Sequence, residues 1–311
     1  MEDNFQVLSK EEIRRCRHKC EKRWYRRLVI INILIIISVI SITICSGKEN
    51  NEFINGLKTD FKTILTEGNT SKNNDKNIDI DDELEDIPLG LNYLILGIVS
   101  IIMVPFILSY FYAKFISMSV KVTRNNFPEI YDIVEEYSRR LELKKVPNVY
   151  IIQGNGILNA MASFIPFKQY VVLYADLIEV GYREHHDMAS IRFILGHEMA
   201  HIKLKHSTLG YSIKILFANL VPIISSTASR TREYSCDRIA QKLSGSDGID
   251  AMLALSVGKH LYKSVDVDDY IKEAKGIRGF FVWCNNLASD HPILPKRIQA
   301  LKMKEGSGKL Y

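Results

Sequence analysis

Cysteine is scarce in this chain, and the few cysteines are not arranged as a disulfide framework. There are five in 311 residues, an odd number at irregular spacings. This favours reduced thiols and a main domain that faces the cytoplasm. Cys16 and Cys20 flank His18 in a basic segment. We expect a solvated basic face there, with a metal site or acylated cysteines as the weaker alternatives.

A signal-peptide cleavage site is also lacking. No small-x-small pattern follows the first long apolar run, Leu28 to Cys45, so a retained anchor is the better interpretation. This run holds 18 residues without a charge, enough to span the hydrocarbon core. A second uncharged stretch, Leu89 to Tyr112, holds 24 residues and contains Pro105, which can kink it. We expect transmembrane helices at residues 28–45 and 89–112.

The chain has no large excess of charge of one sign, since its net charge is only +5, but the charged residues are unevenly distributed along the sequence. Residues 14–27 hold eight lysines and arginines against one acid, Glu21, and basic residues also follow the second apolar run. Residues 46–88 hold eleven acids and five lysines, and no periodic pattern there supports a packed core. The positive-inside rule then makes 1–27 a basic cytoplasmic tail and 46–88 a flexible, acidic extracytoplasmic loop. In this interpretation the basic cluster sets topology and contacts anionic lipid instead of nucleic acid.

The remaining residues, 113–311, look like one α+β domain that is mostly helical with a small β-sheet. Phe127 to Leu143 reads as an amphipathic helix that opens at Pro128. Short β-like and helical segments follow it: Asn148 to Gln153, Asn159 to Phe164, Gln169 to Ala175 and Asp176 to Glu179. A strand, a hairpin and a helix make a frame on which an extended peptide can add to an exposed sheet edge.

The pattern with the most chemistry is His197-Glu198-Met199-Ala200-His201, inside an apolar-periodic stretch from Met188 to His206 that predicts a helix. Four residues advance a helix by about 400°, so His197 and His201 lie one turn apart on one face. Two imidazoles placed in this way can bind one tetrahedral zinc. Glu198 lies about 100° around the helix from His197, where a general base for a zinc-activated water is needed.

A third metal ligand must come from elsewhere, because a catalytic zinc has three protein ligands and one open position. Glu233 and Asp237 are four residues apart and therefore lie on one helical face. This pairing predicts that one carboxylate binds the metal while the other hydrogen-bonds a ligating imidazole. Taken alone, the pair would be an ordinary charged helix face, but it follows the zinc motif by 32 residues.

The stretch Leu209 to Ser225 is apolar but short, and it carries Lys214 and Pro222. A single membrane crossing there would separate the third ligand from the two histidines. Since the ligands of one metal must meet, a single crossing is excluded. A helical hairpin that dips into the membrane stays open, and we expect a core or interfacial helix.

A further histidine stands late in the chain, in Asp290-His291-Pro292, with Arg297 after it. Brought to the metal site, His291 could donate a hydrogen bond to the oxyanion of a tetrahedral intermediate. In isolation it would be a turn residue before proline.

Together these motifs give the chain a resemblance to the HtpX-like membrane zinc metallopeptidases, the group that also contains the CAAX prenyl proteases. The match runs from about Val120 to Leu301, after two apolar runs in the expected place. Besides the motifs already quoted, it is carried by a Pro-containing helix before Val146-Pro147, by Asn159-Ala160 and by Ser229-Arg230 ahead of Glu233.

The resemblance implies a zincin-type peptidase domain with one Zn²⁺ per chain, held by His197, His201 and Glu233. It implies three further roles: Asp237 beside a ligating histidine, Glu198 as general base and His291 as transition-state donor. The Asn159-Ala160 segment would line the substrate groove. The implied function is a membrane-anchored zinc endopeptidase that acts on membrane or misfolded proteins at the cytoplasmic face. Its partners would be a protein or peptide substrate and the lipid bilayer, without nucleic acid, and the oligomeric state stays open.

The chain departs from the family pattern at Met161, at Ser163-Phe164 and at Cys236, where Phe, Thr-Gly and Ala are usual. We expect altered substrate preference with every ligand intact. Two alternatives stay open: a non-catalytic zinc-binding membrane scaffold or sensor, and another zinc hydrolase or a peptidase of a prenylated substrate. The intact Glu198 argues against a scaffold, which would need the histidines but not the base. Two spans in place of a large helical chamber argue against a prenylated substrate.

Overall fold

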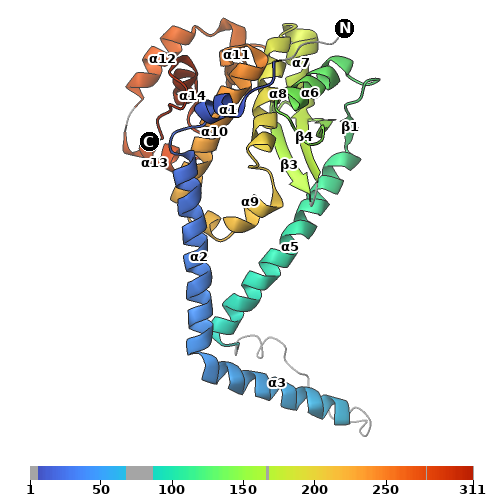
Figure 1. Cartoon of the computed structure of the whole chain (residues 1–311), viewed down its shortest axis with the longest axis vertical. Coiled ribbons are helices and arrows are strands. Elements are labelled where there is room, and N and C mark those ends of the chain that lie inside the picture. Colours follow the sequence, from blue (N-terminus) through green and yellow to red (C-terminus); the bar gives the residue numbers. More distant parts are fainter. Residues whose placement is uncertain (1–5, 68–86, 166–167, 278, 311) are drawn as a thin grey trace. The chain divides into compact units, whose positions relative to one another are not determined.

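A computed structural model describes residues 6–67, 87–165, 168–277 and 279–310. The chain divides into a large unit, Met1–Ile30 with Pro105–Tyr311, and a small unit, Ile31–Val104. Most of the described chain is helical, and the sheet found in it is small and mixed (Figure 1). The mostly helical fold with a small sheet, expected from the sequence, is confirmed at this level.

The helical elements and strands follow one another in an order that places most helices after the sheet. Up to the sheet they are α1 (Lys10–Cys16), α2 (Glu21–Cys45), α3 (Gly47–Glu67), α5 (Leu89–Ser117), β1 (Ser119–Lys121), α6 (Pro128–Arg140), β2 (Asn148–Ile152), β3 (Ala160–Ile165) and β4 (Lys168–Tyr174). After it come α7 (Ala175–Glu179), the π-helix η1 (Val180–Glu184), α8 (Met188–Lys203), α9 (Leu209–Lys214), η2 (Ala218–Leu220), α10 (Pro222–Ser244), α11 (Ile249–Val257), η3 (Tyr262–Ser264), α12 (Val267–Gly276), α13 (Phe280–Ala288) and α14 (Leu294–Lys302).

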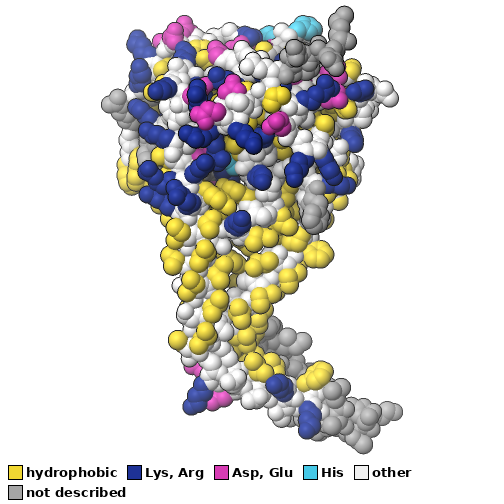
Figure 2. All heavy atoms as spheres, in the orientation of Figure 1, with side chains coloured by type: hydrophobic (Ala, Val, Ile, Leu, Met, Phe, Trp, Pro, Cys, Tyr) yellow, Lys and Arg dark blue, Asp and Glu magenta, His cyan; other side chains and the backbone are white. Residues whose placement is uncertain are grey.

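The small unit consists largely of helices with exposed apolar side chains. α2 enters it from the large unit and α5 leaves it, and both are long and apolar enough to cross a membrane. Of the most apolar part of each helix, at most 11% is buried, and Leu34, Ile44 and Leu96 are more than half exposed. Hydrophobic side chains cover these helices in the space-filling view (Figure 2). Such a surface is unfavourable in water and favourable in a bilayer.

Residues 47–67 form helix α3, where the polar composition of the sequence predicts a flexible loop. Phe53, Leu57 and Phe61 recur every four residues, so they share one face of an amphipathic helix. The predicted loop is wrong for these residues because a helix can form on this apolar face even where the composition is mostly polar. The acidic run 79–86 lies outside the described residues.

The sheet of the large unit has the strand order β1-β2-β4-β3. β2 and β4 pair in parallel, with Val149 opposite Val171, whereas β1 with β2 and β3 with β4 pair antiparallel. Alternate residues face opposite sides of the central strands. The side chains on one side of the sheet belong to the main core together with residues of α6 and α8. Those on the other side pack against Tyr112 and Phe115 of α5. β3 is an edge strand, and α8 contacts it.

Helices α8 and α10 pack against each other at the centre of the large unit (Figure 1). Gly196 on α8 permits the close approach, because a Cβ there would lie 3.2 Å from the Cα of Ala240 on α10. α8 contacts the sheet through β3 and β4, while α10 contacts α13 and α14. The motif histidines of α8 face α10, because His197 and His201 both lie 3.4 Å from Glu233 on that helix.

The N-terminal segment is folded onto the large unit. A capping box between Ser9 and Glu12 begins α1. Ile13 and Cys16 on α1 are buried in the main core, and His18 is only 3% exposed. The basic side chains of Arg14, Arg15 and Lys19 are exposed, as the expected solvated basic face requires. The expectation is wrong for Cys16 and His18, which are buried where α1 contacts α10.

The stretch Leu209–Ser225 does not form one helix. α9 ends at Lys214, η2 is a single turn, and α10 begins at Pro222. Ile215 and Ala218 are buried, whereas α9 has no buried residue. Among the described residues, α2 and α5 alone meet the length and apolarity of a membrane span. This agrees with the expectation that the stretch does not cross a membrane.

Candidate metal centre

Three donor side chains from α8 and α10 converge in the large unit. The Nε2 atoms of His197 and His201 lie 3.2 Å apart. Glu233 on α10 places Oε2 3.4 Å from His197 Nε2 and Oε1 3.4 Å from His201 Nε2. Two ligand atoms about 2.0–2.1 Å from one tetrahedral zinc are about 3.3 Å apart, so these separations suit one ion. The sequence brought the same three residues together as candidates, and they could hold a metal ion.

The state of Glu233 also fits a cation. Its Oε2 atom is buried and has no hydrogen-bond partner among the described residues. A buried carboxylate oxygen in that state is costly unless a positive group lies beside it. Three carboxylates stand at or beside the cluster, those of Glu198, Glu233 and Asp237, and the guanidinium of Arg297 lies beside the last two. The donor set therefore has the charge and geometry that a divalent cation needs.

His197 is held in one orientation by Asp237. Its Nδ1 lies 2.8 Å from Asp237 Oδ1, so Nδ1–H donates to the carboxylate and Nε2 is left for a metal. Arg297 on α14 donates to both oxygens of Asp237, from Nε at 2.9 Å and from Nη2 at 2.6 Å. The sequence named Arg297 only as part of a family pattern. Its clamp on Asp237 depends on a contact across 60 residues that no local spacing reveals.

Electrostatics in this cluster favours a positive group beside His197. Burial would lower the pKa of His197, but the hydrogen bonds and charges of Asp237 and Glu233 outweigh it and raise the pKa to about 10. Burial would likewise raise the pKa of Glu233, but His197 and His201 hold it well below its usual value. A proton on His197 and a metal ion at its Nε2 are thus competing ways to satisfy the same carboxylates.

Glu198 lies beside the cluster without belonging to it. Its Oε2 accepts a hydrogen bond of 2.6 Å from the backbone N–H of Ala162 on β3. The carbonyl of Ala162 accepts from the hydroxyl of Ser207. The edge strand thus passes directly alongside the carboxylate, which places both at the same site.

His291 reaches the centre from the loop before α14. Its Nε2 lies 3.5 Å from Glu233 Oε2, and its side chain remains 66% exposed. Ser226 on α10 holds the preceding Asp290 by a hydrogen bond of 2.9 Å. The structure therefore brings together His197, Glu198, His201, Glu233 and His291, all of the site residues expected from the sequence.

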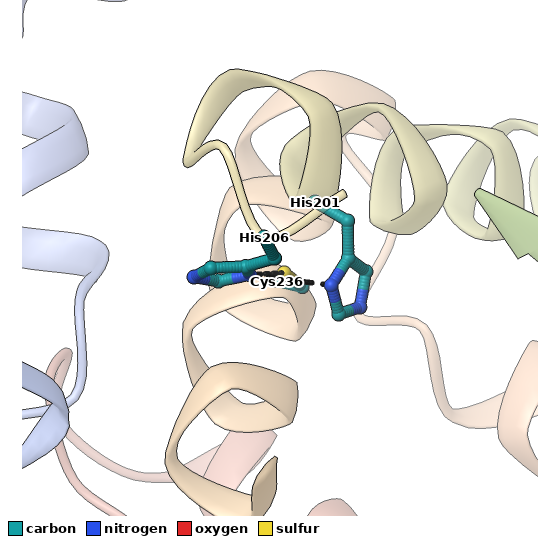
Figure 3. A group of neighbouring side chains, drawn as sticks. All are labelled: His201, His206 and Cys236. Atoms are coloured by element: carbon teal, nitrogen blue, oxygen red, sulfur yellow. Dashed lines mark hydrogen bonds between the residues drawn. The ribbon is translucent and has the colours of Figure 1, made fainter. Parts of the chain in front are cut away.

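Two residues beside the cluster were not foreseen. His206 follows α8 and lies against His201, and Glu21 at the start of α2 lies against His206. His201, His206 and Cys236 form a second group that could hold a metal ion, and Figure 3 shows the three side chains facing one another. The fifth position after His201 could have drawn attention to His206. Nothing in the local sequence connects Glu21 with it.

Comparison with known families identifies the family of the chain. Residues 124–221 and 210–305 match the model of peptidase family M48, and together they cover more than half of the chain. The chain belongs to peptidase family M48. M48 peptidases are zinc-dependent, so this M48 chain is a zinc metallopeptidase with protein or peptide substrates. No curated protein matches it.

Proposed function

We propose that this M48 peptidase is a membrane-anchored endopeptidase of the HtpX-like branch, with a zincin-type domain that hydrolyses peptide bonds of membrane or misfolded proteins. One Zn²⁺ per chain would be held by His197, His201 and Glu233. The observation that carries the proposal is the convergence of these three donors within 4.8 Å of one another. The position of Glu198 beside the edge strand supports it further.

The chemistry divides between the ion and the side chains. Zinc, when bound, supplies Lewis acidity that brings the pKa of a water near 7 and polarises the substrate carbonyl. Glu198 accepts the proton of the attacking water and then gives it to the leaving amine. Asp237 and Arg297 keep His197 in the tautomer that presents Nε2. His291 donates a hydrogen bond to the oxyanion that develops on the substrate.

The edge strand β3 supports binding of an extended peptide. Within the described residues it pairs only with β4, and Ala162 directs its N–H to Glu198. A substrate segment laid along this edge would gain main-chain hydrogen bonds and pass the catalytic carboxylate. Asn159-Ala160 at the start of β3 would then line the groove. Such recognition is largely independent of side chains, which suits unfolded or misfolded substrates.

The two apolar helices support membrane anchoring. α2 and α5 would span the bilayer over residues 28–45 and 89–112, with basic residues at the ends nearest the large unit. By the positive-inside rule, both termini and the peptidase domain of residues 113–311 would lie in the cytoplasm and residues 46–88 outside. A protease-accessibility assay in sealed vesicles, with a tag at residue 311 or within 46–88, checks this topology. Protection of the C-terminal tag in right-side-out cells and of the loop tag in inverted vesicles is expected.

The function is tested by cleavage of casein, an unfolded protein, by the full-length protein purified in detergent. Glu198→Gln should keep its zinc and lose about 10²–10⁴-fold in turnover, the usual contribution of a general base. Glu273→Gln, an exposed change of the same chemistry on α12, is the matched control and should cleave at the wild-type rate. Near wild-type cleavage by Glu198→Gln would remove Glu198 from the mechanism. Cleavage of a prenylated peptide but not of casein would favour the prenyl-protease alternative, and zinc without any cleavage would favour a scaffold.

A further inference from the structure

A chain of hydrogen-bonding groups leads from His201 to the base of α2. His201 Nδ1 lies 3.2 Å from His206 Nδ1, and His206 Nε2 lies 3.2 Å from Glu21 Oε1. The side chains of His206 and Glu21 are each only 3% exposed. All three residues belong to the large unit, because α2 leaves that unit only after Ile30. The contact between His206 and Glu21 joins residues 185 positions apart.

The protons along this chain can be assigned from its two ends. His201 turns Nε2 toward His197 and Glu233, so with Nε2 on a metal its proton must sit on Nδ1. Nδ1–H then donates to His206 Nδ1, which fixes the proton of a neutral His206 on Nε2. Nε2–H in turn donates to the carboxylate of Glu21. Each ring nitrogen thereby has one partner of the right kind.

Both His206 and Glu21 are held in place by further hydrogen bonds. The backbone N–H of His206 donates to the carbonyl of His201 at 2.9 Å, which closes the turn after α8. Glu21 accepts hydrogen bonds from the Ser235 hydroxyl on α10 and from the guanidinium of Arg17. The carboxylate is thus fixed between α10 and the segment that joins α1 to α2. A buried carboxylate with this many donors is rigid enough to orient an imidazole.

The same three rings and thiol also allow a different interpretation, a second metal ion between His201, His206 and Cys236 (Figure 3). His201 would then have to bind one ion through Nε2 and another through Nδ1, which requires a fully deprotonated imidazole ring. The Cys236 thiol is completely buried and lies 3.8 Å from His206 Nδ1. A neutral hydrogen-bond chain that ends on a carboxylate does not need a deprotonated imidazole ring, and the contacts favour it.

We propose that His206 and Glu21 are positioning residues for the metal ligand His201, as Asp237 is for His197. The proposal rests on the proposed role of His201 as a zinc ligand. It assigns each ligating histidine its own acidic support: Asp237 directly for His197, and Glu21 through His206 for His201. It also makes the foot of the first candidate membrane helix part of the metal centre, so the peptidase domain needs residues that precede its family match.

The test measures zinc affinity by chelator competition on the full-length protein in detergent. His206→Leu fills the volume of the ring but accepts no hydrogen bond, and should weaken zinc binding about 10–100-fold. His206→Asn places an oxygen near the position of Nδ1 and should restore most of the affinity, a rescue that a purely packing role would not produce. His260→Leu, at a 64% exposed histidine paired with Glu184, is the matched control. It should bind zinc as the wild type does.

A second pair of variants, at Glu21, and the zinc content of the wild type complete the test. If His206→Leu does not fold, Glu21→Leu against Glu21→Gln makes the same comparison, because glutamine still offers an acceptor oxygen to His206. Equal affinity in wild type, His206→Leu and Glu21→Leu, with zinc lost in His197→Ala, would overturn the positioning role and leave the proposed function standing. Two zinc ions per wild-type chain, one of them lost in Cys236→Ser, would also overturn it. A wild type that binds no zinc would overturn both proposals.

Discussion

Replacing Asp237 with asparagine perturbs the support of His197 with little change of shape. Asp237 is 1% exposed, accepts from His197 Nδ1 at 2.8 Å, and accepts twice from Arg297. Asparagine has one acceptor oxygen and one donor NH₂ group. The Oδ1 position accepts from both His197 Nδ1 and Arg297 Nη2, so an amide oxygen placed there keeps His197 and turns an N–H only toward Arg297 Nε, whereas an amide NH₂ placed there turns an N–H toward His197. Either His197 loses the partner that fixes its tautomer, or Arg297 loses half of its clamp.

The size of the effect follows from these contacts. Losing the partner of a ligating histidine typically weakens metal binding 10–100-fold, which is about 1.4–2.7 kcal/mol. Breaking a buried ion pair costs about 3–5 kcal/mol of folding free energy. Arg297 keeps a second carboxylate nearby, because Glu233 Oε2 lies 3.6 Å from its Nη2. We therefore expect Asp237→Asn to lower the free energy of unfolding by about 3 kcal/mol, the lower end of the range for a broken buried ion pair.

Two assays on the full-length protein in detergent check both numbers: zinc affinity by chelator competition, and denaturant unfolding of the zinc-free protein. Asp269→Asn, at an exposed aspartate on α12, is the matched control and should leave both unchanged. A folded Asp237→Asn protein with both wild-type zinc affinity and wild-type stability would refute the reasoning, because at least one of the two neighbours must lose an acceptor. Wild-type stability with reduced affinity would instead show that Arg297 is satisfied by Glu233 alone.

Two further predictions concern α8 itself. Gly196→Val should lower the free energy of unfolding by about 1–3 kcal/mol, because its side chain would meet the backbone of Ala240, whereas Gly210→Val has open space and should cost less; equal losses in a denaturant titration would contradict this. Burial raises the pKa of Asp187, the N-cap of α8, but hydrogen bonds from Ser190 and others outweigh it and lower the pKa. A lowered pKa stabilises the fold above about pH 4 and ceases to do so as pH falls through the folded value, so Asp187→Asn should lose less stability from pH 6 to pH 3 than wild type. Parallel pH profiles would exclude that contribution.

Local periodicity accounts for the parts of the fold that could be predicted. His197 and His201 share a helical face because they are four residues apart, and Glu233 with Asp237 follows the same rule. The strands β2, β3 and β4 and the helix that begins at Pro128 lie within a residue or a few of the expected ranges. These patterns involve only residues that are close in the sequence, so they can be recognised from the sequence alone.

The remaining parts depend on contacts between distant segments. Helix α1 contacts α10, and its buried residues are Ile13 and Cys16, too few to produce a pattern among the surrounding charges. The contact of Glu21 with His206 spans 185 residues, and Glu21 looked like a lone acid in a basic cluster. The apolar spacing of residues 47–67 predicts the helix α3, but their polar composition favours a loop.

The central claim is that zinc is bound by His197, His201 and Glu233, and X-ray absorption at the zinc edge of the full-length, zinc-loaded protein tests it most directly. The account predicts only nitrogen and oxygen neighbours, at about 2.0–2.2 Å, with a spectrum unchanged by Cys236→Ser. A sulfur neighbour at about 2.3 Å that disappears in Cys236→Ser would place the ion in the group of His201, His206 and Cys236 and contradict the account.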